Sequence, residues 1–349
     1  MGRLIDGVWV SDDAAKTDAS GRWSRTPTVC RGWTRADGST PYLPEAGRYH
    51  LWLAWNCTWS QRTLIVANLL GLQGALSVSM AHWHRNDGGW WFRDGIDDLQ
   101  PDAEQAWELW SADRGFEVAP PARGLSLWRV YAAGDPSYTG RATVPVLWDR
   151  RRGEVVSNES SDILRMLETE WGAVAGSDID LRPARLADAI DQTNAWVYDG
   201  INNGVYKAGF ARSQAAYKEA VEAVFAALDR ADARLGRRRY LCGDVLTEAD
   251  VRLYPTLVRF DPVYFSHFKC SLRRISDYPH LGAYLRDLHQ TPGFAETVDV
   301  QAYQLGYMGR SERLNPSRIL PSGPALDWDA PHDRDRLGPR RFARRSAPT

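Results

Sequence analysis

The stretch over residues 49–80 restricts the possible folds more than any other part of the sequence. The apolar run Tyr49–Trp55 is typical of a buried strand. Residues Cys57–Leu70 follow with apolar side chains suited to a helix, and Gly71 is a typical helix stop. The alternation over Leu76–Met80 predicts a second strand. A strand, a helix and a strand in this order indicate the start of an α/β unit.

A proline inside a third apolar run adds to this prediction. Residues Ala142–Trp148 are typical of a strand, but Pro145 cannot donate a ladder hydrogen bond, so the strand is expected to be an edge or to carry a special turn. Residues Glu154–Ser157 are predicted to be its hairpin partner, and Asn158–Ser161 opens a helix that runs to about Trp171. These elements together predict an α/β domain of thioredoxin type.

The pattern changes after this domain and predicts helices only. Residues Ser213–Leu235 carry an apolar helical stripe that starts at a capping serine and is stopped by Gly236. Thr247–Asp250 has the form of a capping box, and His280–Gln290 predicts another helix. We therefore expect a thioredoxin-like domain over residues 46–172 and an all-helical domain over the next segment, 178–312.

The two ends of the chain lack such periodicity. Residues 1–45 are rich in Gly, Ser, Thr, Asp and Pro and are interpreted as an irregular N-terminal arm. Residues 313–349 are interpreted as an extended C-terminal tail. The part after Pro331 holds six Arg against two Asp and is predicted to be disordered, with a basic contact arm as the alternative.

Composition and charge argue against several classes of protein. The 43 Lys and Arg nearly cancel the 44 Asp and Glu, so the net charge of the chain provides no electrostatic attraction to nucleic acid or to an anionic membrane. No apolar run approaches the roughly 18–20 residues of a membrane span, and a secretory signal is not seen. Four widely spread cysteines disfavour a disulfide scaffold, and His82 and His84 lack partners at metal-ligand spacing. We expect a cytoplasmic protein with free thiols and no metal.

Cys57 is the residue best suited to carry chemistry. It lies where a strand turns into a helix, and the free N–H groups and dipole of a helix N-terminus favour a thiolate. Ser60 stands where dithiol oxidoreductases have their second cysteine, so a mixed disulfide at Cys57 would need an external thiol to resolve it. A buried structural cysteine is the alternative. The spacing predicts single-cysteine chemistry with a small thiol as co-substrate.

Two further residue pairs suit an amino-acid-like ligand. The pair Val144-Pro145, if its peptide bond is cis, would expose the backbone groups of Val144 to an extended ligand. The pair Glu159-Ser160 lies at a helix start, where free amides and a hydroxyl bind a carboxylate and an acid binds an ammonium group. The order of these pairs after Cys57 predicts a ligand that carries both charges.

Several longer segments resemble the glutathionyl-hydroquinone reductases, the Xi class of glutathione transferases. The resemblance covers about Ala46–Pro331, and its strongest segments are Gly89–Phe92, Thr143–Asp149, Asn158–Ser161, Asn202–Phe210, Arg239–Asp244 and Arg259–Tyr264. It implies a thioredoxin-like domain, an all-helical glutathione-transferase C-terminal domain and a homodimer. The family usually reads Cys-Pro-Trp-Ala-His-Arg where this chain reads Cys57-Thr-Trp-Ser-Gln-Arg62.

The resemblance also implies roles for individual side chains. It makes Cys57 the catalytic cysteine and Tyr206 the catalytic tyrosine, while Tyr264 and Tyr307 match tyrosines that help the cysteine to ionise. The implied glutathione contacts are Trp90, Arg141, Val144, Glu159 and Ser160. For each tyrosine the alternative is a core ring with its hydroxyl bound to backbone.

The implied reaction is the glutathione-dependent reduction of S-glutathionyl-hydroquinones to hydroquinones. Cys57 attacks the conjugate sulfur, Tyr206 supplies a proton to the ring carbon, and a second glutathione resolves the mixed disulfide. Two other hypotheses stay open: an omega-like thiol transferase or dehydroascorbate-type reductase that does not need the tyrosines, and a non-catalytic binding protein for glutathione conjugates. The expected partners are glutathione and aromatic glutathione conjugates. The many tryptophans are interpreted mainly as core residues, with a wall for the aromatic ring as a further hypothesis.

Overall fold

The computed structural model describes residues 2–11, 17–92, 117–118, 125–309 and 313–345. The chain divides into two compact units, which we call the sheet unit and the helical unit. The sheet unit holds Met1–Ala14 and Pro27–Ser177, and the helical unit holds Ala15–Thr26 and Asp178–Thr349. The N-terminal arm is therefore shared between the units, with its middle segment in the helical one.

The sheet unit is built on a five-stranded sheet with the order β6-β4-β3-β8-β9. The central strand β3 (Tyr49–Ala54) pairs in parallel with β4 (Leu76–Ala81) and antiparallel with β8 (Val146–Asp149). Strand β9 (Glu154–Ser157) completes a hairpin with β8, and β6 (Glu117–Val118) pairs with β4 at the other edge. The predicted strand–helix–strand unit and hairpin are confirmed.

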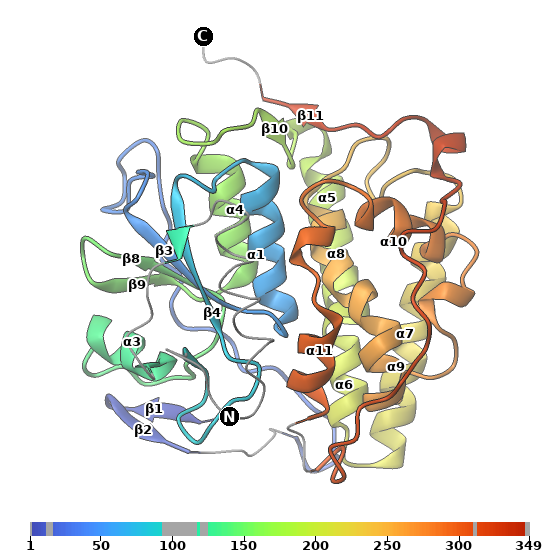
Figure 1. Ribbon diagram of the computed structural model, residues 1–349, viewed down its shortest axis with the longest axis horizontal. Coiled ribbons are helices and arrows are strands. Elements are labelled where there is room, and N and C mark those ends of the chain that lie inside the picture. The colour runs from blue at the N-terminus through green and yellow to red at the C-terminus, as the bar shows by residue number, and fades with distance from the viewer. Residues whose placement is uncertain (1, 12–16, 93–116, 119–124, 310–312, 346–349) are drawn as a thin grey trace. The chain divides into compact units, whose positions relative to one another are not determined.

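Helices cover this sheet on both faces. Helices α1 (Thr58–Leu69) and α4 (Ser160–Glu170) lie side by side on one face (Figure 1). Tyr49 of β3 points to that face, where its ring meets Trp171 at the end of α4. Side chains alternate along a strand, so Trp52 points the other way and joins the core cluster of α3 (Leu127–Gly134).

Pro145 stands immediately before β8 rather than inside it. The Val144-Pro145 peptide bond is cis, and β8 begins at Val146. Strand β8 lies between β3 and β9, so it is not an edge strand. Of the two predicted options, an edge strand or a special turn, the structure has the turn. The predicted strand over Ala142–Trp148 is therefore too long at its start, because the backbone before Pro145 does not join the ladder.

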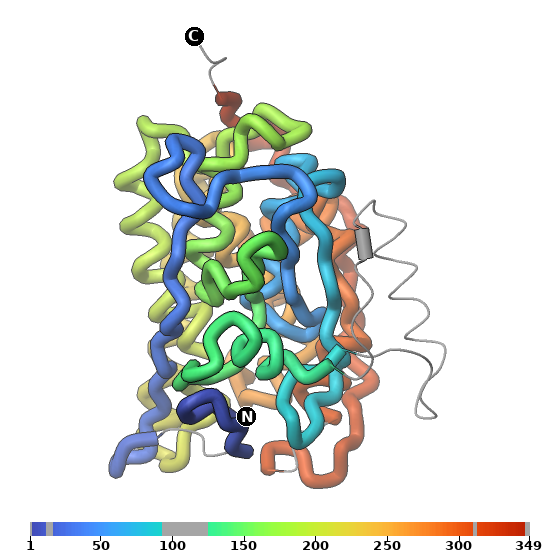
Figure 2. The backbone as a smooth tube through the Cα atoms, turned by 90° about the vertical axis from the view of Figure 1, so that its left-hand side faces the viewer, coloured from blue at the N-terminus to red at the C-terminus, as the bar shows by residue number. Residues whose placement is uncertain are grey.

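The prediction of a wholly irregular arm is wrong at its start. Strands β1 (Arg3–Ile5) and β2 (Val8–Val10) form a hairpin, whose turn Asp6-Gly7 has φ values of 48° and 76°. An Asp-Gly pair between short apolar runs is a strong hairpin signal, and it is present in the sequence. The hairpin lies beside α3 in both views (Figures 1 and 2), and the ring of Trp9 stacks on Trp128 at 6.1 Å.

The remaining elements are short strands and the helices of the second unit. Strands β5 (Trp91–Phe92) and β7 (Leu125–Ser126) pair with each other, as do β10 (Ile179–Asp180) and β11 (Ala343–Arg344). The helical unit contains α5 (Ala187–Val197), α6 (Gly204–Phe210), α7 (Gln214–Leu235), α8 (Glu248–Arg259), α9 (Phe265–His267), α10 (Leu281–His289) and α11 (Val300–Tyr307). Ser213 caps α7, and Thr247 and Asp250 form the predicted capping box of α8.

The prediction that the end of the chain is disordered is wrong for the residues described up to 345. The chain forms a short helical turn at Arg334–Leu337 and then β11. Arg334 is fully buried and donates to the carbonyls of Leu235 and Arg239. Arg340 pairs with Asp287, so arginines of the tail bind the helical unit instead of remaining in solvent.

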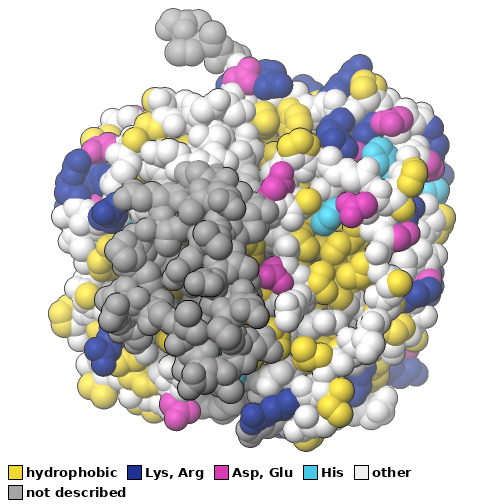
Figure 3. Space-filling model, in the orientation of Figure 1, with side chains coloured by type: hydrophobic (Ala, Val, Ile, Leu, Met, Phe, Trp, Pro, Cys, Tyr) yellow, Lys and Arg dark blue, Asp and Glu magenta, His cyan; other side chains and the backbone are white. Residues whose placement is uncertain are grey.

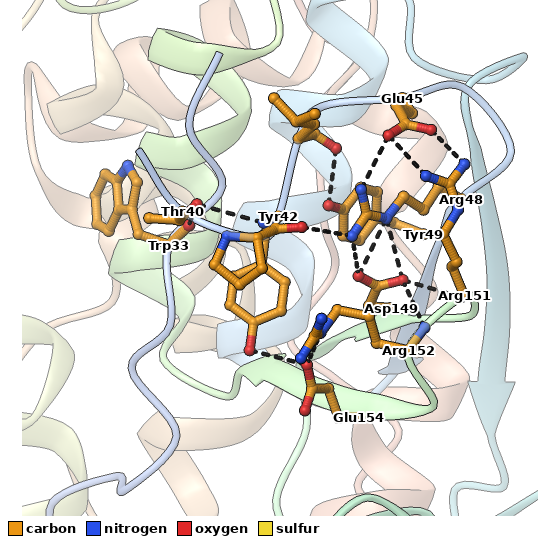
Figure 4. A network of polar contacts seen from close by, with 12 residues as sticks. Trp33, Thr40, Tyr42, Glu45, Arg48, Tyr49, Asp149, Arg151, Arg152 and Glu154 are labelled. Atoms are coloured by element: carbon orange, nitrogen blue, oxygen red, sulfur yellow. Dashed lines mark hydrogen bonds and ion pairs between the residues drawn. The ribbon is translucent and has the colours of Figure 1, made fainter. Parts of the chain in front are cut away.

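A buried ion pair ties the start of β3 to the end of β8. Arg48 and Asp149 approach to 2.5 Å, and their side chains are 5% and 0% exposed. Glu45 and the carbonyl of Pro41 accept further hydrogen bonds from Arg48. Arg151 joins this network by donating to Glu45 (Figure 4). Burial alone would raise the pKa of Asp149, but hydrogen bonds from Arg48 and from backbone N–H groups lower it.

Asp149→Asn is expected to lower the free energy of unfolding by up to about 3 kcal/mol, because it removes the buried partner of Arg48 and leaves the more exposed Glu45 as its counter-charge. Since the folded-state pKa of Asp149 is lowered, the stabilisation of the wild type is fully present above pH about 4 and is lost progressively as pH falls through the lowered folded-state pKa. Urea unfolding at neutral and acidic pH measures both effects. Arg151→Gln, which breaks an exposed ion pair with Glu45, is the control and should change stability by less than about 1 kcal/mol.

Charges of both signs are interspersed over the described part of the surface seen in Figure 3. Among the described residues, no group of three His, Cys, Asp or Glu side chains could hold a metal ion. None of the described helices is both long enough and apolar enough to cross a membrane.

Candidate active-site residues

Cys57 is the N-cap residue of α1, as the strand-to-helix pattern predicts. Its backbone is extended (φ −87°, ψ 114°), and its Sγ accepts a hydrogen bond from the N–H of Ser60 at 3.4 Å. Only 9% of the residue is exposed. Free amides at a helix start stabilise negative charge. Arg62 is buried one turn further along α1, with its guanidinium 4.5 Å from the ring centre of Trp59.

The cis Val144-Pro145 turn lies next to this sulfur. The carbonyl of Val144 is 3.7 Å from Cys57 Sγ, close enough to accept a hydrogen bond from the thiol. Cys57, Val144 and Trp90 belong to one buried cluster of the sheet unit. Trp90 is 7% exposed, and the guanidinium of Arg85 lies 4.8 Å from its ring centre. Arg141 is half-buried in the segment that leads to this turn, and its carbonyl accepts from the Tyr138 hydroxyl.

Glu159 and Ser160 form the start of α4. The carboxylate of Glu159 caps the helix by accepting from the N–H of Ser161 at 3.1 Å, and Ser160 is 3% exposed. Burial alone would raise the pKa of Glu159, but hydrogen bonds from Ser161 and Thr28 and the charge of Arg62 lower it. A charged acid and helix-terminal amides together can bind an ammonium and a carboxylate group.

Three tyrosine hydroxyls of the helical unit meet at one point. The hydroxyls of Tyr206 and Tyr307 are 2.7 Å apart, and that of Tyr264 lies 3.1 Å from Tyr307 and 3.5 Å from Tyr206. We call these three residues the phenol cluster. They come from α6, from the end of a π-helical turn and from the end of α11. Mutually bonded hydroxyls can donate a proton and share the resulting negative charge.

One π-helical turn precedes Tyr206, and another contains Tyr264. One turn, Tyr198–Asn202, comes before α6, and the other, Phe260–Tyr264, ends at the cluster residue itself. Such turns are often found at functional sites. Asn202 links the first turn to α8 by donating to Thr256 at 2.8 Å.

Gly209 of α6 leaves room for the ring of Phe268, since a Cβ at residue 209 would lie 2.2 Å from that ring.

A buried cation lies near the phenol cluster. Arg259 is fully buried at the end of α8, and its guanidinium lies 3.6 Å from the ring centre of Tyr303. Burial alone would lower the pKa of Arg259, but the phenols of Tyr303 and of the phenol cluster raise it. Sequence reasoning did not identify this residue.

The arm residues Trp23 and Arg25 are also missing from the sequence prediction, although both contact Tyr206. The ring of Trp23 stacks on Tyr206 with centres 6.1 Å apart, and Arg25 lies 5.1 Å from the Tyr206 ring centre. Phe268 stacks on Tyr264 at 5.2 Å. An aromatic and an arginine inside a Gly- and Ser-rich segment were the only signal in the sequence.

The other three cysteines have thiols with raised pKa values. Burial raises the pKa of the Cys30 thiol to about 11 and that of Cys270 to about 12, and burial also raises the pKa of Cys242. Thiols with raised pKa values stay protonated at neutral pH and react slowly with alkylating agents.

Brief iodoacetamide treatment at pH 7 is therefore expected to label Cys57 alone in the folded protein. Peptide mass mapping measures the label at each cysteine, and treatment after unfolding in guanidinium chloride is the control, in which all four become labelled. Labelling of Cys30, Cys242 or Cys270 at a rate similar to that of Cys57 would contradict this account.

The chain is similar to proteins of known structure and function. Residues 56–170 match the glutathione S-transferase N-terminal domain, and residues 214–287 match the glutathione S-transferase C-terminal domain. The glutathionyl-hydroquinone reductase YqjG of Escherichia coli is 43% identical over 96% of this chain and 99% of its own length. The glutathionyl-hydroquinone reductase PcpF of Sphingobium chlorophenolicum is 41% identical over 93% of this chain and 97% of its own.

The chain is also similar to solved structures of glutathione transferases. The Xi-class glutathione transferase of Natrialba magadii superposes with a TM-score of 0.81 at 39% identity, and 97% of each chain is covered. The glutathione-bound structure of Escherichia coli YqjG superposes with a TM-score of 0.80 at 42% identity, covering 96% of this chain and 99% of that one.

Proposed function

We propose that this chain, which belongs to the glutathionyl-hydroquinone reductase family of Xi-class glutathione transferases, reduces S-glutathionyl-hydroquinones with glutathione. The main observation behind the proposal is the position of Cys57 Sγ at the N-cap of α1, in the fold of this family. Residue 60, where a dithiol oxidoreductase has its second cysteine, is a serine. A lone sulfur in this position suits exchange with a glutathione thiol.

In the first step the thiolate of Cys57 attacks the sulfur of the conjugate. A bond forms between the two sulfurs, and the bond between the conjugate sulfur and the aromatic carbon breaks. The electron pair of the broken bond stays on the ring carbon, which takes up a proton as the hydroquinone leaves. Cys57 is left as a mixed disulfide with glutathione.

In the second step a glutathione thiolate attacks this mixed disulfide at the glutathione sulfur. Glutathione disulfide leaves, and Cys57 is again a thiolate. Each cycle reduces one conjugate by two electrons and oxidises the two glutathionyl groups to the disulfide. Ser60 cannot perform this resolution, which explains the need for an external thiol.

We assign the proton transfer to the phenol cluster, with Tyr206 as the donor. Its hydroxyl is hydrogen-bonded to that of Tyr307 at 2.7 Å, so negative charge left on Tyr206 is shared with its neighbours.

Glutathione is expected to lie along the cis-proline turn of the sheet unit. Backbone groups of Val144 would pair with the ligand backbone, and Glu159 and Ser160 would bind the charged groups of its glutamyl end. Trp90 and Arg141 are the remaining proposed contacts. We also propose that the protein binds aromatic glutathione conjugates, forms a homodimer and lies in the cytoplasm. Light scattering after size-exclusion chromatography measures the oligomeric state.

The test is a turnover assay with S-glutathionyl-hydroquinone and excess glutathione. Release of hydroquinone and glutathione disulfide in equal amounts supports the proposed reaction. Disulfide exchange on small disulfides without cleavage of the conjugate would instead support an omega-like thiol transferase. Binding of the conjugate without either product would support a non-catalytic binding protein.

A further inference from the structure

A segment of the N-terminal arm is held firmly against the helical unit. The carbonyl of Gly21 accepts from the N–H of Arg212, and the carbonyl of Ser20 accepts from the hydroxyl of Ser213, the cap of α7. Gly21 has φ +85°, and a Cβ there would lie 2.9 Å from the nitrogen of Ser213. Only glycine permits this approach together with this backbone angle. The arm is therefore built to be fixed at the start of α7.

The fixed segment presents a ring and a cation to the phenol cluster. Trp23 stacks on Tyr206 and contacts Phe210 at 5.6 Å between ring centres. Arg25 lies 5.3 Å from the ring centre of Trp23 and 5.1 Å from that of Tyr206. Its Nε donates to Asn203 Oδ1 at 2.7 Å, so one edge of the guanidinium is held in place.

This arrangement has the features of a recognition surface for an anionic aromatic group. Trp23 and Arg25 are both half-buried, so part of each side chain is exposed. An indole offers a flat stacking face, and a guanidinium of fixed orientation binds a carboxylate or phenolate with a charge-assisted hydrogen bond.

We infer that Trp23 and Arg25 form the arm's side of the binding surface for the aromatic ring, and that Arg25 selects conjugates whose ring carries an anionic group. The inference rests on the proposed function, because it assigns the ring of a glutathione conjugate to the neighbourhood of Tyr206. It names the substrate class as S-glutathionyl-hydroquinones with a carboxylate or another ionised group on the ring.

The test compares two conjugates that differ in one group: S-glutathionyl-hydroquinone and its analogue with a carboxylate on the ring. Titration calorimetry on the Cys57→Ser protein measures the Kd of both without turnover. Arg25→Met in this background is expected to weaken binding of the carboxylated conjugate about tenfold and that of the neutral one less than about threefold. Arg25→Lys, which keeps the charge, is expected to retain part of the preference.

A matched control comes from elsewhere in the helical unit. Arg230 on α7 lies over the ring of Trp196 at 4.4 Å, so Arg230→Met removes an arginine of the same kind away from the phenol cluster. It should leave both Kd values unchanged. Equal weakening of both conjugates by Arg25→Met, or no weakening, would overturn the inference.

The same experiment separates this inference from the proposed reaction. If the wild type fails to turn over either conjugate while the Arg25-dependent preference in binding is present, the reaction is wrong and the recognition surface stands. If the wild type turns over both conjugates with no dependence on Arg25, the reaction stands and the inference is wrong.

Discussion

Replacing Cys57 by serine will lower the turnover of S-glutathionyl-hydroquinone by about a thousandfold or more, because the nucleophile of the covalent step is lost. A serine hydroxyl stays protonated at neutral pH, and it cannot form a mixed disulfide. The hydroxyl occupies similar space at the N-cap of α1 and can accept from the same N–H group, so the variant should fold. The rate of hydroquinone release under excess glutathione measures the effect.

Cys242→Ala is the matched control for this experiment. Cys242 is a buried thiol of the helical unit whose pKa is raised by burial, and it has no part in the proposed reaction. Its replacement should leave turnover within about threefold of the wild type. A Cys57→Ser protein that keeps more than about a tenth of wild-type turnover would contradict the role of this sulfur.

Tyr206→Phe is expected to slow conjugate turnover by about a hundredfold to a thousandfold, since general acid catalysis is worth this much. The ring and its contacts with Trp23 and Phe268 remain, and only the hydroxyl that would donate the proton is removed. Disulfide exchange by Cys57 needs no proton at carbon, so it should be nearly unchanged. The ratio of the two activities is therefore the informative measurement.

Tyr217→Phe controls for the loss of a phenol hydroxyl from the helical unit. That hydroxyl donates to the carbonyl of Lys269, outside the phenol cluster. Its removal should leave both activities within about threefold of wild type. If Tyr206→Phe slowed disulfide exchange as much as conjugate cleavage, a general structural effect would explain the loss better than proton donation.

The order of elements around Cys57 could be predicted because each depends on local patterns. Apolar runs and Gly71 predict β3, α1 and β4, with ends within a residue or two of those observed. Ser213 and the Thr247 capping box likewise predict the starts of two helices from a few residues each. Short-range rules are sufficient for such features.

Features that depend on distant parts of the chain could not be predicted in this way. The phenol cluster joins residues about a hundred positions apart, and only the family resemblance grouped them in the sequence. The two π-helical turns have no clear sequence pattern, because one extra residue per turn is stabilised by tertiary packing. The sequence around Arg334 is typical of a disordered basic segment. The carbonyls of Leu235 and Arg239 that bind Arg334 lie far away in the sequence and can be identified only from the structure. The Asp6-Gly7 hairpin, by contrast, had a recognisable signal.

The most direct test of the central claim is the mass of the protein after exposure to an equimolar amount of S-glutathionyl-hydroquinone without free glutathione. We expect one added glutathionyl group, located on Cys57 by peptide mapping, with hydroquinone released in equal amount. Added glutathione should then remove the group and yield glutathione disulfide. Release of hydroquinone with no adduct on Cys57, or an adduct on Cys30, Cys242 or Cys270 instead, would contradict it.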